Sequence, residues 1–354
     1  MTAENVPIVL DNADFFEAVD LPDKEVDRIL GLGRKMSLDM IKKFGVKFEE
    51  HGVPKVGKTS WALSAVNCTL KNPKMKPHLR WLIQNEYVTL PTPVLVIDTE
   101  KRSNRLVNVF KDQDIITWNI RFPDQKKPYR EDPVKTLELM WKILLVIYKK
   151  FKTGTIVIDT HTYINRKIRN FIQNELIKRG APGHELGEFI RLMPQDHSVR
   201  NDIWDYVIAL LLDMSQHVVF ISRDKEEWGM IPGEKGDNKF GKTGELEPSH
   251  YKELPYEVDV ELNYTFENPD MNNPLSKLQR VMNLEEFAWS GVNPETQKWI
   301  NPDFTDILNY VTQFSHRSVI KQNLNAIKKL QVESNSKQKK VVVTNGQESN
   351  KPDQ

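Results

Sequence analysis

The residues best suited to chemistry stand together in the stretch GVPKVGKTS at 52–60. Glycines at this spacing let backbone N–H groups curl around phosphate oxygens, and the N-terminus of a following helix also favours an anion. In such a loop the Lys58 ammonium bridges the β- and γ-phosphates, and the Thr59 hydroxyl binds Mg²⁺. We therefore predict a phosphate-binding loop whose nucleotide contacts are Gly52, Val53, Pro54, Lys55, Val56, Gly57, Lys58, Thr59 and Ser60.

The same pattern occurs a second time, over residues 236–243 (GDNKFGKT). That match follows a Gly- and Pro-rich stretch, and Gly244 and Pro248 prevent a helix from starting after it. We therefore assign phosphate binding to the first match alone. The strand expected before the first match contains Glu49 and Glu50, which are unusual in a strand at the centre of a sheet.

Two apolar segments end in a carboxylate that can help to hold Mg²⁺. They are VLVID, which ends at Asp98, and TIVID, which ends at Asp159. A phosphate-binding loop needs such a carboxylate at a strand end to position Mg²⁺ and its waters. VLVID comes first after the loop and is followed by Glu100, whereas TIVID comes later, behind a predicted helix.

Strands and helices must alternate to position these residues. We predict strands over 93–98, 155–159, 217–222 and 256–264, and helices over 60–70, 132–150, 165–179 and 202–214. Runs without polar alternation are typical of strands buried on both faces, and their alternation with helices favours a parallel sheet. The predicted fold class is α/β, with a mostly parallel central sheet flanked by helices.

Four segments in this order, GVPKVGKTSWAL, VLVIDTE, TIVIDT and HVVFISR, resemble the RecA/RadA-like P-loop ATPases. The chain is most similar to the compact RecA-paralogue ATPases of phages and archaeal mobile elements, and the likeness covers residues 44–312. It implies a RecA-like P-loop NTPase fold, with Glu100 activating the attacking water and Asp159 on the Mg²⁺ side. A rival assignment gives the Mg²⁺ role to Asp98 and keeps Glu100 catalytic.

A third candidate catalytic residue follows the strand predicted at 217–222. The resemblance implies a polar residue that senses the γ-phosphate there, often Gln or His, but this chain has Arg223. An arginine at this point can stabilise transition-state charge in cis, or in trans on a neighbouring subunit. The alternative is a solvated surface charge. The predicted catalytic residues are therefore Glu100, Lys58 and Arg223.

The resemblance implies Mg²⁺-dependent ATP binding and hydrolysis by a homo-oligomer that acts on single-stranded DNA in recombination, repair or replication. Two alternatives stay open: a helicase-type motor of the same superfamily, and a nucleotide-gated binding or scaffold protein with little turnover. Near the N-terminus, Phe15-Phe-Glu-Ala18 matches the F-x-x-A form by which RadA-like subunits dock on a neighbour. A chance match is the competing interpretation, because the chain has 15 phenylalanines.

Two segments are candidates for contact with single-stranded DNA, since basic residues among aromatics suit backbone contact plus base stacking. Segment 161–200 carries Arg166, Lys167, Arg169, Lys178, Arg179, Arg191 and Arg200. Segment 223–252, predicted as a glycine-rich loop, carries Trp228, Lys235, Lys239, Phe240, Lys242, His250, Tyr251 and Lys252. The alternatives are an ordinary charged helix and a structural lid, because acidic residues dilute the charge of the second segment.

Composition is that of a globular protein that can bury a core. The 354 residues have a net charge of +1, so any basic surface must be local. The lone Cys68 excludes a disulfide framework and is read as a core residue. No apolar run reaches the ~18 residues of a membrane span, and we expect a cytoplasmic protein.

The predicted organisation has four parts. They are an N-terminal helical extension (1–43), the RecA-like core (44–314), a C-terminal basic helix (315–331) and a polar, disordered tail (332–354).

Overall fold

The computed structural model describes residues 45–100, 106, 109–110, 113–123, 131–178, 194–232, 238–249, 251, 253–268, 279–288 and 297–315. All of them belong to the unit formed by Lys42–Gln354. The predicted extension over 1–43, with its Phe15–Ala18 motif, and the predicted tail over 332–354 lie outside the described residues. So does all but the first residue of the helix predicted over 315–331.

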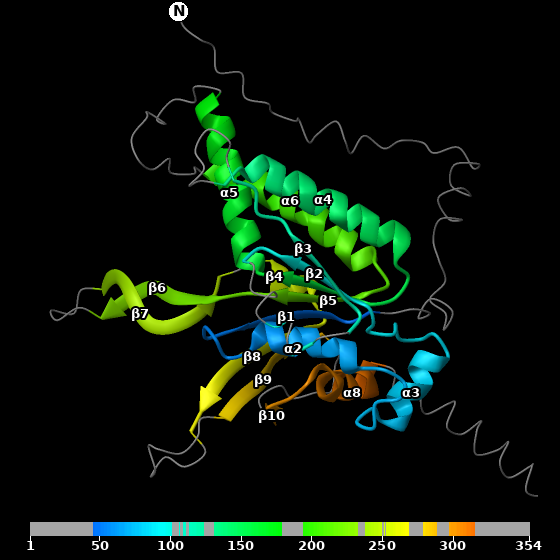
Figure 1. The fold of residues 1–354 in the computed structure, drawn as a ribbon. Coiled ribbons are helices and arrows are strands. Elements are labelled where there is room, and N and C mark those ends of the chain that lie inside the picture. The colour runs from blue at the N-terminus through cyan, green and yellow to red at the C-terminus, as the bar shows by residue number, and fades with distance from the viewer. Residues whose placement is uncertain are drawn as a thin grey trace, which may run out of the picture. The chain divides into compact units, whose positions relative to one another are not determined.

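A sheet of eight strands forms the centre of the described unit, in the order β10-β9-β8-β1-β5-β4-β2-β3 (Figure 1). The strands are β1 (Lys47–Gly52), β2 (Val94–Asp98), β3 (Ile115–Asn119), β4 (Thr155–Asp159), β5 (His217–Ile221), β8 (Val260–Glu267), β9 (Gln279–Phe287) and β10 (Lys298–Ile300). Pairing is parallel from β3 through β8, and β9 and β10 add an antiparallel edge. Because the six parallel strands share one direction, their carboxyl ends meet at the same edge.

Helices cover both faces of the sheet (Figure 1). On one face lie α2 (Lys58–Leu63), its 3₁₀ continuation η3 (Ser64–Asn67), α3 (Pro77–Gln84) and α8 (Phe304–Ser315). On the other lie α4 (Pro133–Lys150), α5 (His161–Lys178) and α6 (Pro194–Asp213). The predicted α/β class, with a mostly parallel central sheet flanked by helices, is confirmed.

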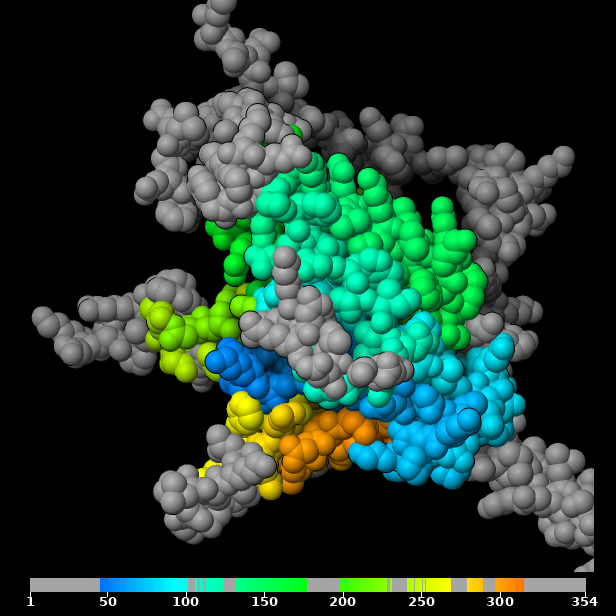
Figure 2. Space-filling view, viewed as in Figure 1, coloured from blue at the N-terminus to red at the C-terminus, as the bar shows by residue number. Residues whose placement is uncertain are grey.

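In Figure 2 the orange surface of α8 adjoins the light-blue surface around α3, and Asn309 Oδ1 accepts a hydrogen bond from Lys76 N at 3.0 Å.

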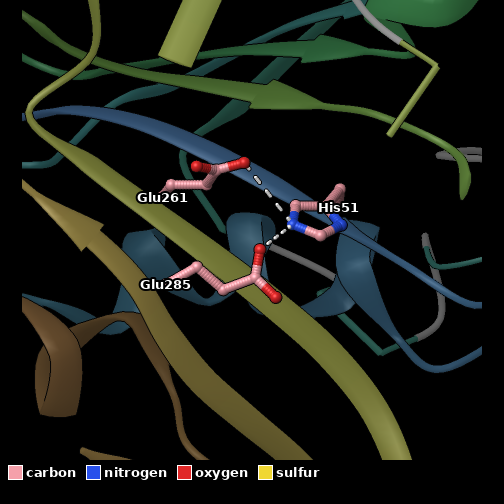
Figure 3. A group of neighbouring side chains, drawn as sticks. All are labelled: His51, Glu261 and Glu285. Atoms are coloured by element: carbon pink, nitrogen blue, oxygen red, sulfur yellow. Dashed lines mark hydrogen bonds and ion pairs between the residues drawn. The ribbon is translucent and has the colours of Figure 1, made fainter. Parts of the chain in front are cut away.

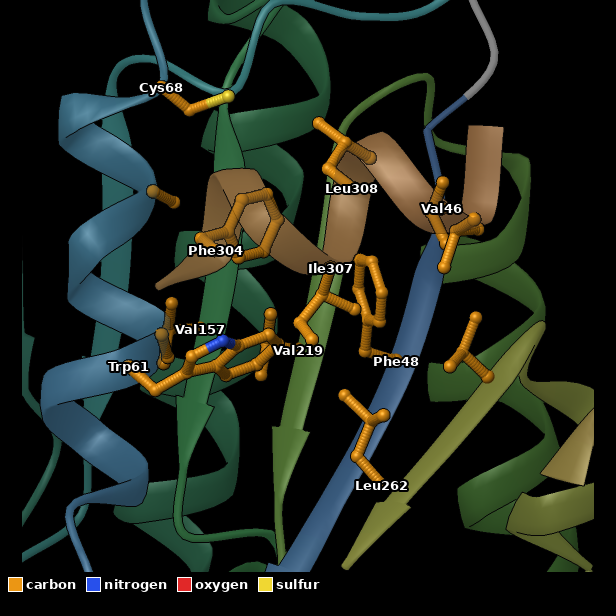
Figure 4. Packing of buried hydrophobic residues seen from close by; sticks show 14 of the residues in the cluster. Val46, Phe48, Trp61, Cys68, Val157, Val219, Leu262, Phe304, Ile307 and Leu308 are labelled. Atoms are coloured by element: carbon orange, nitrogen blue, oxygen red, sulfur yellow. The ribbon is translucent and has the colours of Figure 1, made fainter. Parts of the chain in front are cut away.

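The core under α2 is built around three aromatic side chains. Phe48 of β1, Trp61 of α2 and Phe304 of α8 meet in Figure 4, with ring centroids 5.4 Å apart for Phe48–Phe304 and for Trp61–Phe304. Cys68 is fully buried in the same cluster, as predicted. The helix α8 begins with reciprocal bonds between Asp303 and Asp306, which satisfy the backbone N–H groups of both residues. The packing of Trp61 and Phe304 on Phe48 holds α2, the helix that follows the predicted phosphate-binding loop, against β1.

Three sequence expectations were wrong in detail. The glycine-rich loop predicted at 223–252 contains an antiparallel hairpin, β6 (Asp224–Pro232) with β7 (Asn238–Pro248). The strand predicted at 256–264 is instead the short helix α7 (Leu254–Glu257) followed by β8. The helix predicted at 60–70 stops early, because α2 gives way to η3. Strands β3, β9 and β10 were missed. Strands β3 and β10 form the two edges of the sheet, and β9 pairs antiparallel with β8 and β10.

Candidate functional site

The predicted phosphate-binding loop connects β1 to α2 with a backbone that only certain residues adopt. Gly52 and Gly57 have φ of 137° and 114°, and Lys55 has φ of 67°. A Cβ at Gly52 would stand 2.0 Å from the Tyr264 carbonyl oxygen, so this position requires glycine. In the second match of the pattern, Lys242 and Thr243 lie in strand β7, which continues to Pro248, so no helix starts directly after them, as predicted.

Lys58 is held inside its own loop. Its ammonium donates hydrogen bonds to the carbonyl oxygens of Gly52 at 2.5 Å and Val53 at 3.0 Å, and the residue is 8 % exposed. Burial lowers the pKa of Lys58, and the nearby carboxylate of Glu50 opposes that change. The loop thus presents a partly desolvated cation, which interacts strongly with an anion that enters.

Thr59 and Asp159 lie in direct contact. The Thr59 hydroxyl donates to Asp159 Oδ2 at 2.8 Å, so a hydroxyl and a carboxylate stand side by side at the ends of α2 and β4. Asp98 pairs with Asp159 in the register of β2 and β4, and its Oδ1 accepts a hydrogen bond from the Glu100 backbone N–H at 2.8 Å. Asp159 is therefore the strand-end carboxylate that stands beside the Thr59 hydroxyl.

Glu100 and Arg223 form an ion pair across the ends of β2 and β5. The Glu100 side chain is 12 % exposed and that of Arg223 is 38 % exposed. The Arg223 backbone N–H donates to Thr162 Oγ1 at 3.0 Å, which fixes the chain where it leaves β5. Arg223 is thus paired with a carboxylate while it stays partly exposed. The structure brings the five predicted side chains to one edge of the sheet, namely Lys58, Thr59, Glu100, Asp159 and Arg223.

Sequence reasoning missed Asp224 and Arg280. Asp224 Oδ1 accepts hydrogen bonds from Gly52 N and His51 Nδ1, each at 3.0 Å, and so holds the start of the loop. A Cβ at Gly57 would meet the Arg280 guanidinium 3.0 Å away, which places a cation from β9 against the loop. No short-range pattern links these residues, since only strand pairing brings β6 and β9 to this point.

Glu50, noted above as unusual in a central strand, is fully buried on the face of β1 that lies near Lys58. Neither of its carboxylate oxygens has a hydrogen-bond partner among the described residues. Burial raises the pKa of Glu50 to about 8, with Lys58 opposing the change. Its neighbour Glu49 points to the other face, where Ser222 Oγ donates to it at 2.8 Å. The two glutamates therefore occupy different surroundings.

The residues present fit a triphosphate with Mg²⁺. The loop supplies one buried ammonium and glycine-dependent backbone turns, and the adjacent hydroxyl and carboxylate are oxygen ligands of the kind that Mg²⁺ prefers. Lys55, Thr59 and Ser60 are not fully buried, so the loop is open to a ligand.

Two residues predicted to contact DNA are directed into the protein. Lys167 is 7 % exposed, pairs with Glu131 and lies over the Tyr163 ring at 4.8 Å. Tyr251 is 3 % exposed, and its hydroxyl donates to Asp205 Oδ1 at 2.9 Å. These two predictions were wrong, because Glu131 and Tyr163 engage the Lys167 side chain and Asp205 of α6 engages that of Tyr251. Residues 179–193 of the first segment and 233–237, His250 and Lys252 of the second lie outside the described ranges.

The helices that the structure describes include none long and apolar enough to cross a membrane.

The strand order, the loop and the side chains around it define a P-loop α/β protein. No protein-family model matches the chain, and no curated protein matches it. Among solved structures it is similar to the assembled ATPase EscN of the enteropathogenic E. coli type III secretion system, with a TM-score of 0.32 and 12 % identity over 62 % of this chain and 43 % of that one. A prototypical ATPase from the type III secretion system of pathogenic bacteria gives a TM-score of 0.32 and 12 % identity over 63 % and 52 %. The chain thus spans about half the length of these proteins, and a likeness this slight carries no argument about its activity.

Proposed function

We propose that this chain is an ATPase that uses Mg²⁺. The observation that carries the proposal is the convergence of Lys58, the Thr59–Asp159 pair and Glu100 at one edge of the sheet. A cation, two Mg²⁺ ligands and a carboxylate base are the groups that phosphoryl transfer to water requires. A purely structural loop would need neither the Thr59–Asp159 contact nor the Glu100–Arg223 ion pair.

Each side chain has a distinct task in this proposal. Lys58 exchanges its bonds to two loop carbonyls for the β- and γ-phosphates, and the glycine turns supply backbone N–H donors. Thr59 and Asp159 hold Mg²⁺, which neutralises phosphate charge when it is bound. Glu100 accepts a proton from the attacking water or orients it.

The Glu100–Arg223 ion pair sets the resting state of the site. While Arg223 holds one oxygen of Glu100, that oxygen is not available to a water molecule. A bound γ-phosphate is a stronger partner for the guanidinium than a single carboxylate, because it carries more charge. Nucleotide binding would therefore draw Arg223 to the phosphate and release Glu100 for its catalytic task.

The experiment separates hydrolysis from binding. Glu100→Gln should lower the hydrolysis rate by about 10²–10⁴-fold while ATP affinity stays within about threefold of wild type. The matched control is Glu138→Gln, because that carboxylate is 59 % exposed on α4, away from the loop. If wild type is as slow as Glu100→Gln, the chain is a nucleotide-gated scaffold. An equal loss of hydrolysis rate in Glu100→Gln and Glu138→Gln would contradict the assignment of Glu100.

We also propose that the core is of the RecA type and that it works as a homo-oligomer on single-stranded DNA. This rests on the resemblance of its four motifs. Lys225 and Lys242 of the β6–β7 hairpin are more than half exposed, but each pairs with a glutamate, which reduces the charge they offer to a phosphate backbone. The test is the ATPase rate with and without single-stranded DNA, and no stimulation at low salt would oppose a DNA role.

A further inference from the structure

A second group of side chains lies on the face of β1 opposite Glu50. His51 of β1, Glu261 of β8 and Glu285 of β9 point toward one another (Figure 3). Pairing of β1 with β8, and of β8 with β9, brings the three strands side by side. None of these side chains takes part in the site proposed for ATP.

The spacing of this cluster suits a metal ion. His51 Nε2 lies 2.8 Å from Glu285 Oε2 and 3.6 Å from Glu261 Oε1, and all three ligand atoms lie within 4.8 Å of one another. Ligand atoms at ~2.1 Å from a tetrahedral ion are ~3.4 Å apart. Adjustments of about an ångström in side chains would therefore complete the coordination.

Glu261 gives an independent reason to expect a ligand. Its side chain is only 9 % exposed, and His51 Nε2 lies 3.6 Å from its Oε1, which is longer than a hydrogen bond. The Glu261 side chain points at His51 Nε2, and Glu49 is the residue of β1 that pairs with Glu261 in the strand register. Such a long contact compensates a largely buried carboxylate only in part, and a cation between Glu261 and His51 would compensate it better.

Two further residues orient the cluster from outside. Asp224 accepts from His51 Nδ1 at 3.0 Å, which turns Nε2 toward the two glutamates. Asn263 Nδ2 donates to Glu285 Oε1 at 2.8 Å, which leaves Oε2 facing the histidine. Metal-binding histidines and carboxylates have outer partners of this kind.

The local charge also favours a divalent ion. Three acidic side chains, of Asp224, Glu261 and Glu285, lie within 3.6 Å of the nitrogens of the single imidazole. An adjoining cavity of about 450 Å³ reaches Glu261 and Glu285 and is also lined by Asp259 and Glu286. This cavity gives an entry path and room for water ligands.

We propose that His51 Nε2, Glu261 and Glu285 bind a divalent first-row transition metal ion, with Zn²⁺ and Mn²⁺ as the probes. The mixed nitrogen and oxygen ligands suit these ions better than Mg²⁺, which prefers oxygen alone. The ion joins β1, β8 and β9. Asp224 links it to the phosphate-binding loop, because the same carboxylate oxygen accepts from Gly52 N.

The test is metal binding by the full, nucleotide-free chain after chelator treatment, measured by titration calorimetry with Zn²⁺, Mn²⁺ and Mg²⁺ in turn. Without nucleotide, the Mg²⁺ site proposed for hydrolysis does not compete. We expect one Zn²⁺ or Mn²⁺ per chain, with Mg²⁺ at least about 100-fold weaker. This result does not depend on whether the chain hydrolyses ATP. Likewise, a failure to bind Zn²⁺ or Mn²⁺ would leave the ATPase proposal unaffected.

Variants locate the ion. Glu285→Gln keeps the bond from Asn263 and should weaken Zn²⁺ binding by about 100-fold, and Asn263→Ala by about 10-fold. Glu286→Gln, the neighbouring carboxylate of the same cavity, is the matched control and should stay within about twofold of wild type. Circular dichroism verifies that each variant is folded. The proposal is overturned if wild type binds none of these ions, if Glu285→Gln binds as wild type does, or if Glu286→Gln weakens binding equally.

Discussion

His217, the first residue of β5, is predicted to make stability sensitive to acid. It is fully buried, its Nδ1 accepts from Val46 N at 3.1 Å, and its Nε2 donates to the Thr89 carbonyl oxygen at 2.7 Å. Those backbone partners fix the neutral ring, because a proton on Nδ1 would face the Val46 N–H. Burial lowers the pKa of His217 from 6.5 to about 4, despite the bond to Thr89.

The sign and size of the effect follow from linkage. Between pH values of about 4 and about 6.5 the unfolded chain binds a proton at His217 and the folded chain does not, so stability falls as pH falls through this window. The neutral ring makes its full contribution to stability at pH values above the His217 pKa of the unfolded chain, which is 6.5. Each unit of pKa difference corresponds to about 1.4 kcal/mol. From about pH 7.5 to about pH 5, wild type should lose about 2 kcal/mol through this residue.

The assay compares urea unfolding of wild type and His217→Gln at both pH values. Glutamine keeps one donor and one acceptor but does not titrate, so all other groups contribute equally to the two proteins. We expect the wild-type free energy of unfolding to drop by about 2 kcal/mol more than that of the variant. Parallel pH profiles would refute the inference that His217 is held neutral.

Three other changes test the core and the loop. Phe304→Ala should lower the free energy of unfolding by about 3–5 kcal/mol, because its ring is fully buried between Phe48 and Trp61; a loss under about 1 kcal/mol in urea would contradict this packing. Gly52→Ala should cost about 3 kcal/mol and abolish binding of fluorescent ATP, since its Cβ would strike a carbonyl oxygen on β8; a folded variant that binds ATP normally would oppose this. Glu50→Gln should remove a fall in stability between pH 5 and pH 9, because burial raises the pKa of Glu50 to about 8 and the folded state holds its proton longer than the unfolded state; an unchanged pH profile would count against it.

Much of the framework could be predicted from the sequence because its signals are local. VLVID and TIVID carry no polar alternation, which is what strands buried on both faces require, and both lie inside the sheet. The loop at 52–60 combines glycines with Lys58 and Thr59 at a spacing that few other structures need. The structure also brings Glu100 and Arg223, chosen by resemblance, into contact.

The rest depends on contacts between distant segments. The Asp224 bond to Gly52 and the contact of Arg280 with the loop arise from strand pairing, which has no signature in one sequence. Lys167 and Tyr251 look like surface residues by type, yet Glu131 and Asp205 draw them inward. The Gly- and Pro-containing segment 223–252 reads as a loop, but cross-strand pairing makes it a hairpin. Residue type alone did not settle these positions.

The measurement that tests the central claim most directly is phosphate release from ATP, with Mg²⁺ present, by wild type and by Lys58→Ala. The ammonium of Lys58 sits inside the loop on two carbonyl oxygens, and its removal deletes the one loop cation that those bonds position. The account predicts steady turnover by wild type and a rate indistinguishable from the protein-free blank for the variant. Equal rates in the two proteins would contradict it, because hydrolysis would then occur away from this loop.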